Sequence, residues 1–95
     1  MAETKIPEWK AEQMERVRTI MAPRFRGWTV MADVLDGGGM IGIMIRHGSG
    51  ATAHSFAVRT SFPENRIHCA ATAARLTEAL KMRIEMHRPD LGCST

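Results

Sequence analysis

Histidine and cysteine are the side chains of this sequence best suited to hold a metal ion. The full set is His47, His54, His68, His87, Cys69 and Cys93. Zinc sites use such residues at short fixed spacings, for example C-x-x-C or H-E-x-x-H, and neither spacing occurs here. His68 and Cys69 are adjacent, so on a helix their side chains would point about 100° apart. The sequence therefore predicts no metal site and no cofactor.

Serine, histidine and aspartate also occur close together, which is the residue set of nucleophilic hydrolysis. The candidates are Ser49, His47, His54, Asp33 and Asp36. Ser49 stands between two glycines, but the complete G-x-S-x-G elbow that activates such a serine is absent. Nothing in the spacing aligns a base with the hydroxyl. We therefore predict that the protein is not an enzyme.

A glycine-rich run at residues 37–42 formally matches the dinucleotide-binding pattern G-x-G-x-x-G. That chemistry requires a strand before the run and a helix after it, so that phosphate meets a helix N-terminus. Here a second β-prone run follows the glycines. The pattern therefore predicts a hairpin turn.

Residues 27–60 contain three short β-prone runs, around which the rest of the chain is organised. They read W-T-V-M-A-D-V-L at 28–35, M-I-G-I-M-I-R at 40–46 and A-H-S-F-A-V-R at 53–59. Glycine-rich segments separate them, as in tight antiparallel turns. The sequence predicts a three-stranded antiparallel meander.

A helical pattern precedes the meander and another follows it. The first covers about 8–22, between Pro7 in its first turn and Pro23 at its end. The second covers about 65–87, with Asn65 as the favoured N-cap and Ser61 to Glu64 as an alternative capping box. The predicted class is α+β in the order α-β-β-β-α.

The length and composition indicate a single small domain. Ninety-five residues, 44% of them hydrophobic, suffice for one core. We expect residues 1–95 to form one domain with an ordered core at about 7–88 and a flexible tail at 89–95. Two cysteines form no disulfide framework, which favours a reduced, cytoplasmic protein. No apolar run approaches the ~20 residues of a membrane helix.

The two faces of the predicted sheet differ in character. Ile41, Ile43 and Ile45 share one face, on which we expect both helices to pack. The other face carries residues that we predict to contact a partner: Met31, Met40, Met44, Arg46 and Arg59. Two alternatives stay open, a helix that covers this second face and a homodimer formed through it. Met82 and Met86 form a further apolar pair away from the core stripe of the last helix.

Nucleic acid is the second class of partner that the sequence suggests. An arginine cluster near the end of the first helix could contact phosphates: Arg16, Arg18, Arg24 and Arg26. The element order resembles that of the double-stranded-RNA-binding domain. That family has a lysine-rich cluster at the start of its last helix, where this chain has N-R-I-H-C-A at 65–70. The alternative function is therefore a small nucleic-acid-binding regulator.

The succession of elements also resembles a group of small phage proteins. The runs W-T-V-M-A-D-V, I-G-I-M-I-R and H-S-F-A-V-R lead through S-F-P-E-N-R into an alanine-rich helix. This is similar to small α+β proteins of bacteriophages and mobile elements, anti-CRISPR proteins among them. The resemblance implies a compact domain that blocks a host complex by occupying its surface. The net charge of +3 disfavours imitation of DNA. We predict a non-enzymatic protein-binding inhibitor or adaptor.

Overall fold

The fold is an α+β arrangement of two helices and one antiparallel sheet, seen in a computed structural model that describes residues 7–48, 50 and 53–91. The strands follow one another in the order β1-β2-β3. This confirms the predicted α-β-β-β-α order. The elements are α1 (Glu8–Met21), β1 (Thr29–Leu35), β2 (Met40–His47), β3 (His54–Ser61) and α2 (Cys69–His87).

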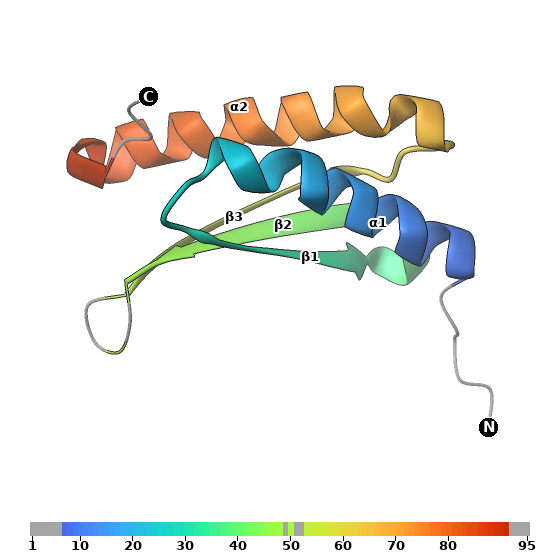
Figure 1. Cartoon of the computed structure of the whole chain (residues 1–95), viewed down its shortest axis with the longest axis horizontal. Coiled ribbons are helices and arrows are strands. Elements are labelled where there is room, and N and C mark those ends of the chain that lie inside the picture. The colour runs from blue at the N-terminus through green and yellow to red at the C-terminus, as the bar shows by residue number, and fades with distance from the viewer. Residues whose placement is uncertain (1–6, 49, 51–52, 92–95) are drawn as a thin grey trace.

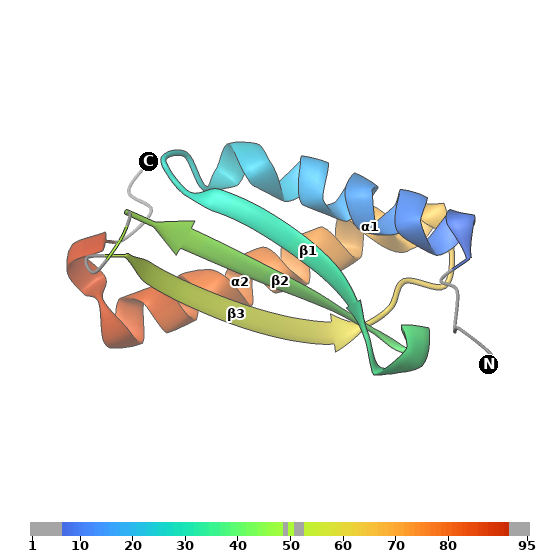
Figure 2. The ribbon, with the colours of Figure 1, turned by 90° about the horizontal axis from the view of Figure 1, so that it is seen from below.

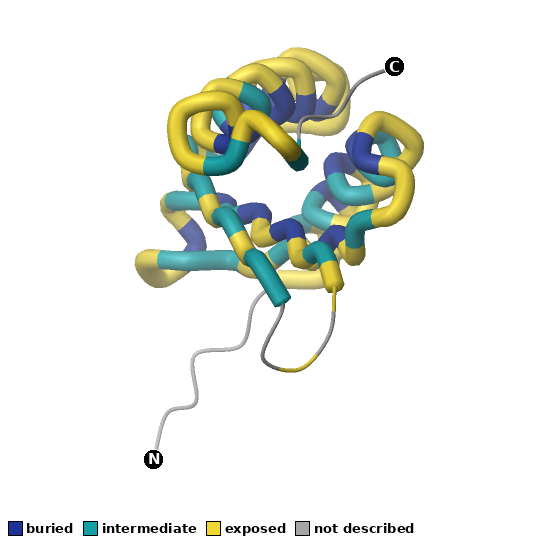
Figure 3. Tube along the Cα trace, turned by 90° about the vertical axis from the view of Figure 1, so that its left-hand side faces the viewer, coloured by how far each residue is buried: buried dark blue, intermediate teal, exposed yellow. Residues whose placement is uncertain are grey.

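Both helices lie on the same face of the sheet, so the molecule has two layers (Figure 1). The isoleucines of β2 point toward the helices, and the end-on view shows the buried residues gathered between the layers (Figure 3). This confirms that the isoleucine face is the core face. Neither helix among the described residues covers the other face of the sheet. The core is Val17, Met21, Phe25, Val30, Ile41, Ile43, Ile45, Cys69, Ala73, Leu76, Leu80 and Ile84.

The turn between β1 and β2 is a 3₁₀ turn, Asp36–Gly38, that also anchors the start of α1. Gly38 has φ +103°, a conformation that side chains other than glycine rarely adopt. The Lys10 ammonium donates a hydrogen bond of 2.6 Å to the Gly38 carbonyl. A Cβ at Gly38 would lie 2.6 Å from that same Lys10 nitrogen. The backbone conformation therefore favours glycine here, and a side chain at this position would also displace the end of Lys10.

Gln13 is a polar residue on the buried side of α1, and it links α1 to the segment that leads into α2. Its side-chain Nε2 donates a 2.7 Å hydrogen bond to the Pro63 carbonyl, and both residues are buried. Burial of a carbonyl is costly unless the oxygen accepts a hydrogen bond. Gln13 therefore stabilises the connection that directs the chain from the sheet back across the helical layer.

The second helical segment begins at the predicted cap. Asn65 Oδ1 accepts hydrogen bonds from the backbone N–H groups of Ile67 and His68, at 3.0 and 3.2 Å. One 3₁₀ turn, Arg66–His68, follows and continues into α2. The predicted Asn65 cap is confirmed, whereas Ser61 is the last residue of β3.

Asn65→Ala is expected to lower the free energy of unfolding by about 1 kcal/mol, because it leaves N–H groups of the first turn without an acceptor. Urea denaturation followed by circular dichroism measures the change. Glu64→Ala is the matched control and should leave stability within about 0.5 kcal/mol. A larger loss for Glu64→Ala than for Asn65→Ala would contradict the assignment of the cap.

The ordered chain extends beyond the predicted core boundary. The sequence predicts a flexible tail from residue 89, but Pro89–Leu91 form a 3₁₀ turn whose Leu91 packs against the core. Arg88 joins this turn to the sheet: its Nη1 lies 3.0 Å from His54 Nδ1, and its Nη2 lies 2.7 Å from a carboxylate oxygen of Asp90. The contact depends on β3, which lies far from Arg88 in sequence. The rest of the predicted tail, 92–95, lies outside the described residues.

Candidate functional site

The face of the sheet that carries no helix is the candidate site. Figure 2 shows it from below, with the three strands in front of both helices. Side chains on this face are aligned by the strand register in four rows of three, one residue from each strand. The rows are Thr29, Arg46 and Ser55; Met31, Met44 and Ala57; Asp33, Gly42 and Arg59; and Leu35, Met40 and Ser61.

The centre of this face is apolar and hollowed. Met31 and Met44 are cross-strand neighbours, and 38% and 37% of their surfaces are exposed. Beside them Gly42 has no side chain, and the Leu35 side chain lies across it: a Cβ at Gly42 would be 2.7 Å from Leu35 Cδ1. Apolar surface left open in this way on a small protein commonly marks a binding site.

We call this hollow the sheet groove and define it by the residues that line it. It is open to solvent and has a volume of about 780 Å³. The lining combines residues of all three strands, of which Ala32, Ile43 and Val58 have their side chains on the helix face, with two residues of α2 beside β3. Its members are Met31, Ala32, Asp33, Leu35, Gly42, Ile43, Met44, Ala57, Val58, Arg59, Ala79 and Arg83.

Charge in the sheet groove is unevenly distributed. Arg59 on β3 and Arg83 on α2 lie along one side, and Asp33 on β1 lies along the other. Asp33 Oδ1 accepts a 2.9 Å hydrogen bond from the backbone N–H of Val34. Among the residues that the structure describes, neither arginine forms an ion pair. The β3 side of the groove therefore offers two cations to an acidic partner.

The structure brings most of the predicted contact residues together. Met31, Met44 and Arg59 line the sheet groove, and Met40 and Arg46 lie on the same face in the rows at either end. Sequence reasoning missed the contributions of Gly42 and Arg83. A glycine in the middle of a strand is a known sign of close approach and could have indicated the hollow. Arg83 carries no such signal, because only the packing of α2 over β3 places it there.

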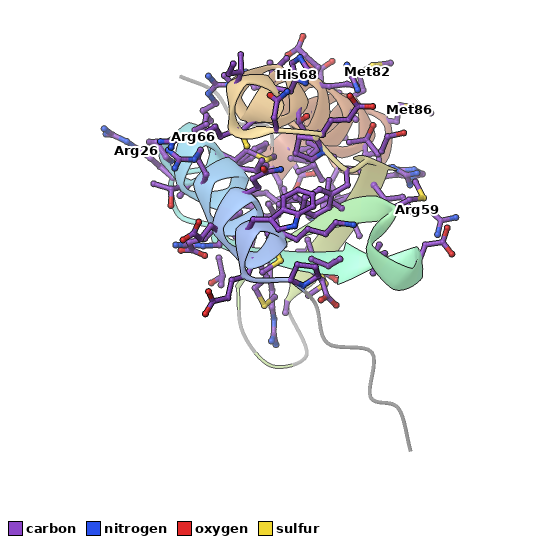
Figure 4. All side chains as sticks on the ribbon, turned by 90° about the vertical axis from the view of Figure 1, so that its right-hand side faces the viewer. Arg26, Arg59, Arg66, His68, Met82 and Met86 are labelled. Carbon is purple, nitrogen blue, oxygen red and sulfur yellow. The ribbon has the colours of Figure 1, made fainter. Side chains whose placement is uncertain are left out.

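Met82 and Met86 lie outside the sheet groove. They project from the solvent side of α2, with 64% and 73% of their surfaces exposed (Figure 4). Their predicted position away from the core stripe is confirmed. They are useful references, because they are exposed methionines that do not belong to the groove lining.

The four arginines proposed as a nucleic-acid contact do not form one surface. Arg16 and Arg18 stand two residues apart on α1, so their side chains leave the helix about 200° apart. Arg18 forms an ion pair with Glu15, which raises the pKa of Arg18 and lowers that of Glu15. Arg24 follows α1 in a 3₁₀ turn, and Arg26 projects from the side of the molecule opposite Arg59 (Figure 4).

The residues considered for hydrolytic chemistry are separated by the fold. His47 and His54 are cross-strand partners on the helix side of the sheet, whereas Asp33 is on the open face. Asp36 belongs to the turn at the opposite end of β2 from His47. Ser49 lies outside the described residues. Within 7–48, 50 and 53–91, no three His, Cys, Asp or Glu side chains are grouped to hold a metal ion.

Cys69 is a core residue at the start of α2, and only 1% of its surface is exposed. Its Sγ lies 3.9 Å from the carbonyl oxygens of Gln13 and Asn65. Burial raises the pKa of this thiol above its ordinary value of 9.0, and the positive charges of Arg16 and Arg66 offset part of that rise. The thiol is therefore protonated at neutral pH.

In a Cys93→Ser background, the Cys69 thiol should react with a disulfide reagent at pH 8 only as fast as the protein unfolds.

The stability of the protein should also depend on the protonation of Cys69. Because folding raises the pKa of this thiol, the protonated thiol contributes fully to the free energy of unfolding below about pH 9, and this contribution is lost as pH rises through the folded-state pKa. Comparing Cys69 with Cys69→Ala by urea denaturation at pH 8 and pH 10 isolates the effect. A stability difference that grows with pH would contradict it.

Comparison with known protein families, with curated proteins and with solved structures finds no match to this chain. Among the described residues, no helix combines the length and the apolar character needed to cross a membrane.

Proposed function

We propose that this chain is a small non-enzymatic protein-binding module, an inhibitor or adaptor, that occupies a surface of a larger complex through the sheet groove. Blocking of a host complex, as by anti-CRISPR proteins of phages, is the mode of action that its architecture suggests. Such a function requires no catalytic residues. It requires a rigid sheet whose exposed side chains can adapt to a partner surface.

The observation that carries the proposal is the open apolar face of the sheet. Met31 and Met44 stand opposite each other at its centre, and both described helices pack on the other face. Methionine side chains are flexible and polarisable, so they fit irregular partner surfaces. The fold does not require these methionines to be buried. A partner that covered them would gain about 25 cal/mol for each Å² of apolar surface removed from water.

The test is capture of a partner by the tagged protein from bacterial lysate, with and without nuclease. The baits are the wild-type chain, Met44→Asp in the groove and Met86→Asp on α2. Met86→Asp is the matched control, because it places the same charge at an exposed methionine outside the groove lining.

The proposal is supported if a discrete protein is still captured after nuclease treatment by the wild type and by Met86→Asp, but is not captured by Met44→Asp. Equal recovery by all three folded baits would contradict the placement of the site. A wild-type bait that is dimeric by light scattering and becomes monomeric with Met44→Asp would instead show that the groove joins two copies of this chain.

The nucleic-acid regulator remains the alternative, and the same experiment separates it. Recovery that depends on intact nucleic acid would point to the arginines of the first helix and its end. Binding through phosphates would also weaken steeply as salt concentration rises. Protein binding is the first proposal because Arg16 and Arg18 leave α1 about 200° apart and Arg18 is already paired to Glu15.

A further inference from the structure

The face of a sheet offers a partner side chains and no free backbone groups. Strand N–H and C=O groups lie in the plane of the sheet, where they point toward a neighbouring strand or outward from the edges of β1 and β3, and none points out of this face. A segment that lies in the sheet groove must therefore satisfy its own backbone hydrogen bonds. An α-helix does so internally, whereas an extended segment on this face would leave its backbone unpaired.

The width of the face also suits one helix. Neighbouring strands are about 4.8 Å apart, so the outer strands of a three-stranded sheet are about 10 Å apart. A helix with its side chains is about 10–12 Å across. One helix would thus cover the face and complete a third layer, with a large apolar side chain seated in the hollow above Gly42.

Charge determines which helix is favoured. Arg59 and Arg83 lie along the β3 side of the groove, and Arg46 lies on the same face beyond Met44. Asp33 is the one acidic residue of the groove lining, and it lies on the β1 side. A bound helix would therefore gain most from carboxylates along the flank that faces β3 and α2.

A second copy of this chain fits the groove poorly. A two-fold interface places the same surface on both sides. Stacking two sheet grooves would gather Arg46, Arg59 and Arg83 of both copies, six guanidinium groups, in one interface. Only one Asp33 per copy would offset them.

On the basis of the proposed function, we propose that the sheet groove binds an amphipathic α-helix of a partner protein, with an apolar stripe on the groove floor and a row of Asp or Glu beside Arg59 and Arg83. The groove thus selects its partner by helical form and by acidic charge on one flank.

Two synthetic helical peptides of about 18 residues test this inference, since shorter helices are marginal in water. Both carry leucine at helical spacing. One has a row of glutamate along one flank, and the other has lysine at the same positions. Affinities for the wild-type protein and for the double variant Arg59→Glu, Arg83→Glu are measured by fluorescence anisotropy, and helix content on binding by circular dichroism.

We expect the glutamate peptide to bind the wild type at least about tenfold more tightly than the lysine peptide, and to gain helix content on binding. In the double variant, the glutamate peptide should lose about 100-fold in affinity, at roughly tenfold for each reversed charge, and the lysine peptide should become the better ligand. Met44→Asp should remove binding of the glutamate peptide.

Equal binding of both peptides, binding of neither, or binding without added helix would overturn the inference. Capture of the protein partner from lysate by the same variants distinguishes failure of this inference from failure of the proposed function. A partner lost with Met44→Asp but kept by the double arginine variant would leave the groove as the site while rejecting the acidic helix. A partner kept by Met44→Asp would reject the groove itself.

Discussion

Replacement of Ile43 by alanine is expected to lower the free energy of unfolding by about 3 kcal/mol. Ile43 is in the middle of β2 with 1% of its surface exposed, on the face that both helices cover. Removing its branched side chain leaves a cavity between the two layers that a close-packed core cannot fill. A domain of this size has roughly 5–10 kcal/mol of stability in total, so the loss would be a large part of it.

The neighbouring residue provides the control. Met44 follows Ile43 in the same strand, but its side chain is on the open face with 37% of its surface exposed. Met44→Ala should therefore cost only about 0.5–1 kcal/mol, mainly through strand propensity and partial contacts. Urea denaturation of both variants measures the difference. Comparable losses at the two positions would show that the open face is covered in the free protein.

Met44→Asp is expected to weaken binding of the protein partner at least about 100-fold. The partner would lose contact with an apolar side chain, worth about 2 kcal/mol when buried. It would also have to desolvate a carboxylate at the centre of the interface, where an unpaired charge costs more. Together these exceed the 2.8 kcal/mol that corresponds to a 100-fold change. Titration of the captured partner by isothermal calorimetry measures it.

The fold must survive this substitution for the result to be informative. Aspartate is a poor strand former and could lower stability by about 1 kcal/mol. Met44→Thr removes the same apolar side chain but keeps a residue that favours strands, and should also weaken binding, by about tenfold or more. Met86→Asp should leave affinity within about twofold, since Met86 is outside the groove. Loss of binding in Met86→Asp as well would show that the contact extends along α2 beyond the groove lining, because Met86 is three residues after Arg83 on that helix.

Local patterns were sufficient to predict the elements and the Asn65 cap. The turn glycines supply positive φ, as Gly38 does at +103°. Asn65 caps the second helical segment through hydrogen bonds to residues two and three positions ahead. The alternation of side chains along β2 predicted that Ile43 and Met44 lie on opposite faces of the sheet. Each of these features depends on residues adjacent in sequence, so the sequence alone carries the information.

Contacts between distant segments were not predictable in the same way. Gln13 is a polar residue on the buried side of α1, and its hydrogen bond to the Pro63 carbonyl joins residues fifty positions apart. Leu91, in the segment predicted to be a flexible tail, packs against the core. No local pattern in the sequence indicates either contact.

Local sequence patterns were enough to predict the α-β-β-β-α order, the antiparallel meander and the two contrasting faces of the sheet, because strand alternation and turn chemistry act over a few residues. The tertiary structure confirmed the expected packing of both helices on one face, and it brought Arg83 of α2 beside Arg59 of β3 at the groove, which no sequence pattern indicated. Those outcomes depend on how whole elements pack, where apolar burial summed over distant residues outweighs any local preference.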